Sequence, residues 1–184
     1  MNPPILSKIG RVLFLLFSAW LPVMCAALPA WSAVDLAQFE EMPNAVLLEK
    51  NIVGGGPPPW EVLERAAAAG FKTVIDLRRP EEGTEAEKSM VEKLGMRYYS
   101  VMVTPRTLSR YQADDVAEIL RKPDNLPAIL HCESGNRSGA VWALYLNLHE
   151  DVDADKALEQ GVLKGLRGRT LKEITREIME NEAK

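Results

Sequence analysis

Short apolar runs rich in valine, isoleucine and leucine alternate with longer segments of mixed polarity along most of this 184-residue chain. The short runs predict buried strands, because strands covered on both faces are almost continuously apolar. They lie at residues 72–77 and 127–132, and residues 46–53 and 96–103 are predicted as strands as well. The longer segments have helical length, and several of them end at a glycine. They predict helices at residues 60–69, 80–94, 109–121, 138–148, 153–163 and 170–181.

Strands that alternate with helices of this length indicate βαβ units. We therefore expect an α/β fold: a single domain with a mostly parallel central sheet of four or five strands and helices on both faces. In such sheets, binding sites lie beyond the carboxyl ends of the strands. Cys132 comes at the end of one predicted strand, and Arg78 and Thr104 come just after two others.

The N-terminal segment has the order of a secretory signal peptide. Lys8 and Arg11 precede an apolar run at residues 12–21, and small residues follow up to position 33. The run is short for a membrane span and is followed by prolines, so an uncleaved anchor is the weaker alternative.

The resulting division is a signal peptide over residues 1–33, a linker over residues 34–45 and a folded domain over residues 46–184, with C-terminal helices within residues 153–182. We expect the mature protein to be periplasmic or secreted, with no stable membrane insertion after cleavage.

The net charge and the cysteine content of the mature chain limit the functions that it can have. Removing residues 1–33, which hold two basic and no acidic residues, changes the formal net charge from −4 to −6. An acidic domain is a poor partner for nucleic acid or anionic membranes. Cys132 is the one cysteine left, so no intrachain disulfide can form. A lone thiol is an oxidation risk in an oxidising compartment, which suggests that Cys132 has a use.

Cys132 lies between a predicted strand and a predicted helix, in a loop that ends at Arg137. A strand, a small-residue turn and a helix N-terminus in that order direct several backbone N–H groups at one point. These groups and the helix dipole favour a thiolate at Cys132 and an anion beside it. Arg137 can hold two anion oxygens with its planar guanidinium. The candidate binding residues of the loop are Glu133, Ser134, Gly135, Asn136 and Arg137.

The run His131-Cys132-Glu133-Ser134-Gly135-Asn136-Arg137-Ser138 resembles the signature loop of the cysteine-dependent protein tyrosine and dual-specificity phosphatase superfamily. It is similar in particular to a small bacterial branch named after its β-lactamase-hydrolase-like fusions, and the similarity extends over residues 46–148. The resemblance implies a dual-specificity-phosphatase-like fold and a phosphorylated small molecule or protein as substrate. It implies neither a metal nor an organic cofactor.

The resemblance also assigns roles to individual residues. Cys132 would attack phosphorus and form a cysteinyl-phosphate, while Arg137 and the loop amides bind the equatorial oxygens. Ser138 would help the thiolate leave in the second step. His131 would brace the loop and favour the thiolate.

Two features depart from the pattern of that superfamily. Most of its members place five residues between the cysteine and the arginine, whereas this chain places four, as many single-domain rhodaneses do. The loop at residues 103–108 also has no carboxylate where these phosphatases usually carry their general acid. A rhodanese-like sulfurtransferase using a Cys132 persulfide therefore stays open, and so does a non-catalytic domain that binds an anion or a partner. The substrate and the oligomeric state are open as well.

The remaining charged residues near the predicted sheet suggest structural roles. We expect Asp76 to form an ion pair with Arg78 and Arg79. The charges at positions 81, 82, 85, 87 and 88 are interpreted as a solvated helix face.

Overall fold

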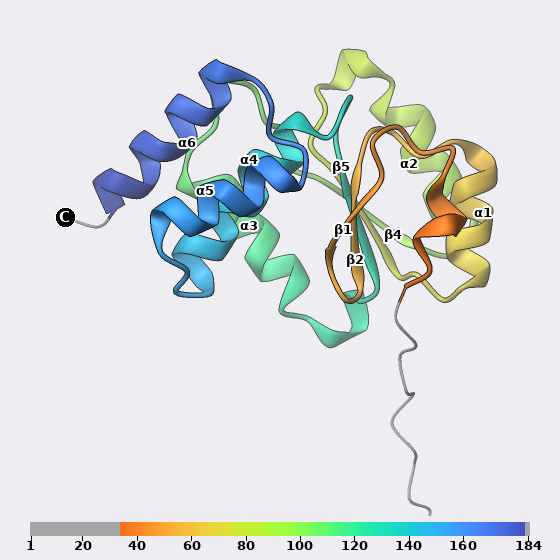
Figure 1. Ribbon diagram of the computed structural model, residues 1–184. Coiled ribbons are helices and arrows are strands. Elements are labelled where there is room, and N and C mark those ends of the chain that lie inside the picture. Colours follow the sequence, from red (N-terminus) through yellow and green to blue (C-terminus); the bar gives the residue numbers. More distant parts are fainter. Residues whose placement is uncertain (1–33, 183–184) are drawn as a thin grey trace, which may run out of the picture. The chain divides into compact units, whose positions relative to one another are not determined.

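The computed structural model describes residues 34–182, which form a five-stranded sheet with helices on both faces (Figure 1). The strands are β1 (Val46–Glu49), β2 (Ile52–Gly55), β3 (Thr73–Asp76), β4 (Arg97–Ser100) and β5 (Ala128–His131). The helices are α1 (Trp60–Ala68), α2 (Thr84–Lys93), α3 (Arg110–Leu120), α4 (Asn136–His149), α5 (Ala154–Leu163) and α6 (Arg169–Glu182). Three 3₁₀ turns accompany them: η1 (Leu36–Phe39), η2 (Pro80–Glu82) and η3 (Pro123–Asn125). The predicted fold class is confirmed.

The order of the strands in the sheet is β1-β2-β5-β3-β4. β2, β5, β3 and β4 run parallel to one another, and β1 pairs antiparallel with β2. The register places His131 beside Gly55 on one side and beside Asp76 on the other. The residues that follow β2, β5, β3 and β4 therefore meet at one edge of the sheet.

Each face of the sheet has its own apolar core. Leu63 of α1 and Val91 of α2 pack with Val53 and Ile129 on one face. Helices α3 to α6 cover the opposite face, where the core includes fully buried residues such as Leu130. Figure 1 shows α1 and α2 on one side of the sheet and α3, α4 and α5 on the other. A strand covered on both faces has no polar side, which explains the continuous apolar runs in the sequence.

Two element boundaries differ from the prediction. The run at residues 46–53 is a hairpin rather than one strand, because the chain turns at Lys50 and Asn51 and pairs β1 with β2. The segment at residues 80–94 is a 3₁₀ turn followed by α2, because Gly83 takes a left-handed conformation with φ of 90° between them. Periodicity does not detect a single left-handed residue.

The segment at residues 34–45, predicted as a linker, belongs to the packed domain, because Phe39 and Met42 are buried against α1 and β2. The predicted signal peptide lies outside the described residues. Within residues 34–182, no helix is long and apolar enough to cross a membrane.

Close backbone packing joins α4 to α5 and to the turn that follows α5. A Cβ atom added at Gly139 of α4 would lie 2.4 Å from the Leu166 backbone nitrogen and 2.8 Å from the Gly161 carbonyl oxygen. Both neighbours are backbone atoms, which cannot move aside as a flexible side chain can. The helix that carries the functional loop is thus held directly against the C-terminal helices.

We expect Gly139→Ala to destabilise the domain, although alanine is the better helix former by about 1 kcal/mol. Overpacking against backbone should cost about 3 kcal/mol or more and outweigh that gain. Urea unfolding at pH 7 measures the net effect as a lower transition midpoint. An unchanged or higher midpoint would show that helix propensity dominates and that the contact is not tight.

Candidate active site

Cys132 is the first residue after β5, and the sheet determines where it lies. Its backbone N–H donates to the Gly55 carbonyl at 3.1 Å, which continues the β2–β5 pairing by one residue. The side chain is only 1% exposed. Gly135 then adopts φ of 85°, a left-handed conformation that glycine takes at little cost, and α4 begins at the next residue. The thiol thus lies beneath a tight loop at the N-terminus of a 14-residue helix.

The backbone amides of this loop are available to a ligand. Within the described residues, no hydrogen-bond acceptor pairs with the N–H groups of residues 133–137. The first N–H groups of a helix have no intrahelical partner, and the helix dipole adds partial positive charge there. Residues 133–137, directly after Cys132, therefore form a nest of N–H groups suited to binding an anion.

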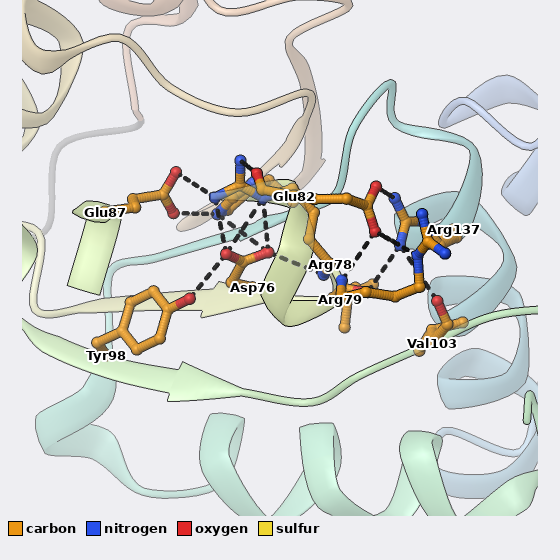
Figure 2. A network of polar contacts seen from close by, with 10 residues as sticks. Asp76, Arg78, Arg79, Glu82, Glu87, Tyr98, Val103 and Arg137 are labelled. Carbon is orange, nitrogen blue, oxygen red and sulfur yellow. Dashed lines mark hydrogen bonds and ion pairs between the residues drawn. The ribbon is translucent and has the colours of Figure 1, made fainter. Parts of the chain in front are cut away.

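Arg137, in the first turn of α4, reaches across the ends of β3 and β4. Its Nη1 donates to the carbonyl oxygens of Leu77 and Val103, both at 3.2 Å. Its Nη1 and Nη2 also donate to the two carboxylate oxygens of Glu82, at 3.1 and 2.6 Å (Figure 2). These contacts use one edge of the guanidinium and leave Nε–H and one Nη2–H for a ligand.

The charge of Arg137 is secured by its surroundings. Burial alone would lower the pKa of Arg137, but the hydrogen bonds with Glu82 and the interaction with Cys132 raise it above the ordinary value for arginine. Its free edge therefore presents a permanent positive charge beside the thiol.

Glu82 is the positioning residue that the sequence analysis missed. The prediction of a solvated Glu82 was wrong, because its side chain is 15% exposed and forms a two-point ion pair with Arg137. Glu82 also accepts from the Arg79 backbone N–H at 2.8 Å and from Arg79 Nε at 3.0 Å. The hydrogen bond from Arg137 lowers the pKa of Glu82 from 4.5 to about 2. Glu82 is therefore a fixed anion at neutral pH.

A cavity of about 250 Å³ opens beside Arg137. It is lined by Arg79, Glu82, Val103, Thr104, Pro105 and Arg137. The loop that forms one wall is tied by its own polar groups, since the Thr104 backbone N–H donates to Thr107 Oγ1 at 3.0 Å. Among the described residues that line this cavity, Glu82 is the one carboxylate, and it is ionised. The cavity thus contains no group able to protonate a leaving group at neutral pH.

The structure brings the predicted site residues together in one loop, but several of their side chains face away from a bound anion. The Ser138 hydroxyl is buried and donates to the Gly135 carbonyl at 2.9 Å, so its proton is not directed at Cys132. Glu133 and Ser134 are exposed at the rim. These two residues, like Gly135 and Asn136, would bind a ligand through their backbone N–H groups.

Two asparagines hold the outer side of the loop. Asn44 Nδ2 donates to the Ser134 carbonyl at 3.2 Å, and Asn44 Oδ1 accepts from Arg167 at 3.1 Å. Asn136 Oδ1 accepts from the backbone N–H groups of Arg167 and Gly168 at 2.8 and 3.0 Å. The turn between α5 and α6 thereby braces the loop. Sequence reasoning could not find these contacts, because their partners lie 31 to 123 positions apart.

Behind the loop lies a second polar cluster, and it is buried. Asp76 and Arg78 form the predicted ion pair, with Arg78 Nη2 at 2.8 Å from Asp76 Oδ2, and the same Nη2 donates to Glu87 Oε2 at 2.7 Å (Figure 2). Tyr98 donates its hydroxyl to Asp76 at 2.7 Å. The prediction of a solvated Glu87 was therefore wrong. Arg79 does not join this cluster and pairs with Glu81 and Glu82 instead.

Comparisons with known proteins identify the family and the fold of this chain. A family model described as "DSP-PTPase phosphatase fused to NAD+ kinase" matches residues 23–180. No curated protein matches the chain significantly.

Three solved phosphatase structures share the fold of this chain. Tk-PTP, in its G95A mutant form, is 20% identical, with a TM-score of 0.64 over 76% of this chain and 96% of its own. The core catalytic domain of the PP-IP phosphatase Siw14 from S. cerevisiae is 15% identical, with a TM-score of 0.60 over 77% and 89%. TpbA from P. aeruginosa is 18% identical, with a TM-score of 0.62 over 83% and 91%.

We expect Glu82→Gln to lower the free energy of unfolding at pH 7 by about 1–3 kcal/mol, because the ion pair with Arg137 is lost. Since the folded pKa of Glu82 lies below 4.5, its stabilisation is complete above that pH and is lost as the pH falls toward 2. Urea unfolding of both proteins between pH 7 and pH 2.5 should therefore show a difference that shrinks on acidification. Glu81→Gln is the matched control, because its side chain is 64% exposed. A difference independent of pH would contradict the pairing.

Proposed function

This chain belongs to the family described as DSP-PTPase phosphatase fused to NAD+ kinase, and we propose that it hydrolyses phosphate monoesters through a cysteinyl-phosphate on Cys132. It is a phosphatase-like hydrolase of the tyrosine and dual-specificity type. The observation that supports this most directly is the convergence of three features: the Cys132 thiol, the unpaired amides of residues 133–137 and the free edge of Arg137. A nucleophile and a cradle for three anionic oxygens are what phosphoryl transfer needs, because its loose transition state is stabilised mainly by positioning and positive charge.

In the first step, the Cys132 thiolate attacks phosphorus and an S–P bond forms. The P–O bond to the leaving group breaks, and its electron pair stays on the departing oxygen. The amides of residues 133–137 bind the equatorial oxygens together with Nε and Nη2 of Arg137. Glu82 contributes by holding the opposite edge of the guanidinium, so that no reorganisation is required when charge develops.

In the second step, water attacks the cysteinyl-phosphate. The S–P bond breaks, the Cys132 thiolate is regenerated, and inorganic phosphate leaves. The Ser138 hydroxyl would assist the departing thiolate only after rotating away from the Gly135 carbonyl, its acceptor in this structure.

The chemistry of the leaving group follows from the cavity beside Arg137. A positioned general acid contributes about 10²- to 10⁴-fold to rates with leaving groups that need protonation. Glu82 cannot act as that acid, because its pKa is about 2 and Arg137 and Arg79 hold it as an anion. Substrates whose leaving group departs as a stable anion, such as aryl phosphates or phosphoanhydrides, therefore suit this site best. Siw14, which shares the fold, is a phosphatase of PP-IP substrates.

The first test follows phosphate release from an aryl phosphate by the domain, comparing wild type with Cys132→Ser and Arg137→Lys. We expect Cys132→Ser to reduce the rate to background. Arg137→Lys should reduce it about 10²- to 10³-fold, because lysine cannot bind two oxygens in one plane. Full activity in Cys132→Ser would rule out the covalent mechanism.

The same proteins, assayed for thiocyanate formation from thiosulfate and cyanide, test the sulfurtransferase alternative that the four-residue spacing supports. We expect no thiocyanate above the level of Cys132→Ser. Cys132-dependent thiocyanate without phosphate release would replace the phosphatase proposal.

The second test compares leaving groups. Across a series of aryl phosphates of rising leaving-group pKa, extended to an alkyl phosphate, kcat/KM should fall steeply in the wild type. This dependence should be the same at pH 5.5 and pH 7.5, because no carboxylic acid in the cavity titrates in that range. A shallow dependence would reveal a proton donor that this interpretation excludes.

A further inference from the structure

Glu87 and His131 form a close contact behind the nucleophile that the proposed mechanism does not yet use. His131, the residue before Cys132, is fully buried, and its Nε2 lies 2.7 Å from Glu87 Oε1. Glu87 comes from α2, across the end of β3, and is 6% exposed. Neither atom has an aligned hydrogen-bond partner among the described residues, and His131 Nε2 also lies 3.9 Å from Asp76 Oδ1. The contact therefore joins α2 directly to the strand that presents the thiol.

Charge balance in this cluster indicates where a proton resides. Asp76 and Glu87 bring two negative charges, and Arg78, which bonds to both, brings one positive charge. The pKa of Asp76 is held below its ordinary value, against its burial, by the hydrogen bond from Arg78 and by the neighbouring His131. With a neutral imidazole, the cluster would keep one uncompensated negative charge in the protein interior, which is costly. One proton at the Glu87–His131 contact would compensate that charge.

Among the described residues, the sheet neighbours of His131 supply no positive charge that would restore the balance. On the β2 side its neighbour is Gly55, which has no side chain, and on the β3 side its neighbour is Asp76. Tyr98 of β4 reaches the cluster through a neutral hydroxyl bonded to Asp76, and burial and that bond raise the pKa of Tyr98. Cys132 itself, as a thiolate, would add a further negative charge.

Asp76, Glu87 and His131 are residue types that often bind metal ions, but their geometry does not fit a metal site. Two ligands of a tetrahedral zinc ion lie about 3.4 Å apart, given zinc–ligand distances near 2.1 Å. The 2.7 Å between His131 Nε2 and Glu87 Oε1 is too short for two ligands of one such ion. Arg78 already donates to both oxygens of Asp76 and to Glu87, so its guanidinium takes the place of a cation.

We propose that Glu87 is a positioning residue for the nucleophile: it holds His131 as an imidazolium, and this positive charge next to Cys132 stabilises the thiolate. The inference rests on the proposed role of Cys132. In this arrangement Arg137 and the loop amides bind the anionic substrate in front of the thiol, while the imidazolium stabilises the nucleophile from behind. A buried carboxylate on α2 thereby acts on the reacting atom through His131 without touching substrate.

The test measures the rate at which iodoacetamide alkylates Cys132 as a function of pH in wild type, Glu87→Gln and Glu85→Gln. If Glu87 sustains the imidazolium, its replacement removes a positive charge beside the thiolate. The midpoint of the profile should then rise by about one pH unit, with a roughly tenfold lower rate below both midpoints. The exposed Glu85, on the same helix, should leave the profile unchanged.

The direction in which the alkylation midpoint shifts shows whether His131 is an imidazolium or neutral. If His131 is neutral, Glu87→Gln merely removes a negative charge near the thiolate, and the midpoint should fall. A lower midpoint, or an unchanged one in a variant that melts cooperatively, overturns the proposal. On a His131→Asn background, Glu87→Gln should have no further effect, because the two residues act as a unit.

A second measurement needs no variant that must fold. The chain has two histidines, His131 and His149, so the imidazole nitrogen resonances of the labelled wild-type protein are few and can be assigned with His149→Gln. At pH 7, both nitrogens of His131 should have the shifts of an imidazolium, and a neutral tautomer would overturn the proposal. Because neither measurement requires turnover, a loss of the phosphatase proposal in the activity assay is distinguishable from a failure of this one.

Discussion

The carboxyl edge of the parallel sheet depends on matching every buried guanidinium with a carboxylate. Two arginines, Arg78 and Arg137, lie there with side chains 6% and 13% exposed. Each is paired with a glutamate from the segment that runs from η2 into α2: Arg137 with Glu82 and Arg78 with Glu87. Removing one partner of such a pair would leave a buried charge without compensation, which destabilises the folded state. The position of this one segment therefore governs both the arginine in front of the thiol and the cluster behind it.

This dependence is compatible with the role proposed for Cys132, although the residue is almost fully buried. Three positive groups lie on its loop side: the unpaired amides of residues 133–137, the N-terminus of α4 and the free edge of Arg137. The carboxylates of Glu82, Asp76 and Glu87 each pair with a guanidinium group. Glu82 occupies the edge of Arg137 that the anion does not need. An anionic nucleophile and an anionic substrate can then share one site, because the fixed positive groups outweigh their mutual repulsion.

The site also relies on regions that are distant in sequence and carry no chemistry of their own. The turn between α5 and α6 and the turn before β1 hold the outer face of the loop through Asn136 and Asn44. Gly139 allows α4 to lie against Leu166 at backbone distance. A loop with only four residues between Cys132 and Arg137 has little slack, so its shape is maintained by these external contacts as well as by the left-handed Gly135. The C-terminal helices are in this sense part of the site's support.

Local patterns predicted the fold well where the physics is local. Apolar runs predicted β3 and β5, because strands that are buried on both faces of a parallel sheet consist almost entirely of apolar residues. Helical segments predicted α1 and α3 to α6. β4 was also predicted, although its four residues are exposed or half-buried. The same patterns joined β1 and β2 into one strand and η2 and α2 into one helix. Each break depends on one or two residues in a special conformation, such as Gly83 with its positive φ, and periodicity averages over them. Glu82 and Glu87 had the same appearance as Glu81 and Glu85 in the sequence, since a charged residue on a helix gives no sign of which face it occupies.

The sequence by itself determined the chemistry of the loop: a cysteine at a strand end, a glycine turn, an arginine in the first turn of a helix, and no carboxylate in the loop at residues 103–108. These are consequences of residue type and spacing within one short segment, where backbone geometry allows few alternatives. Only the tertiary structure decided which glutamates meet Arg137 and His131, and which turns brace the loop. Those contacts join residues from separate elements, and a buried charge finds its partner only when packing brings the two elements together.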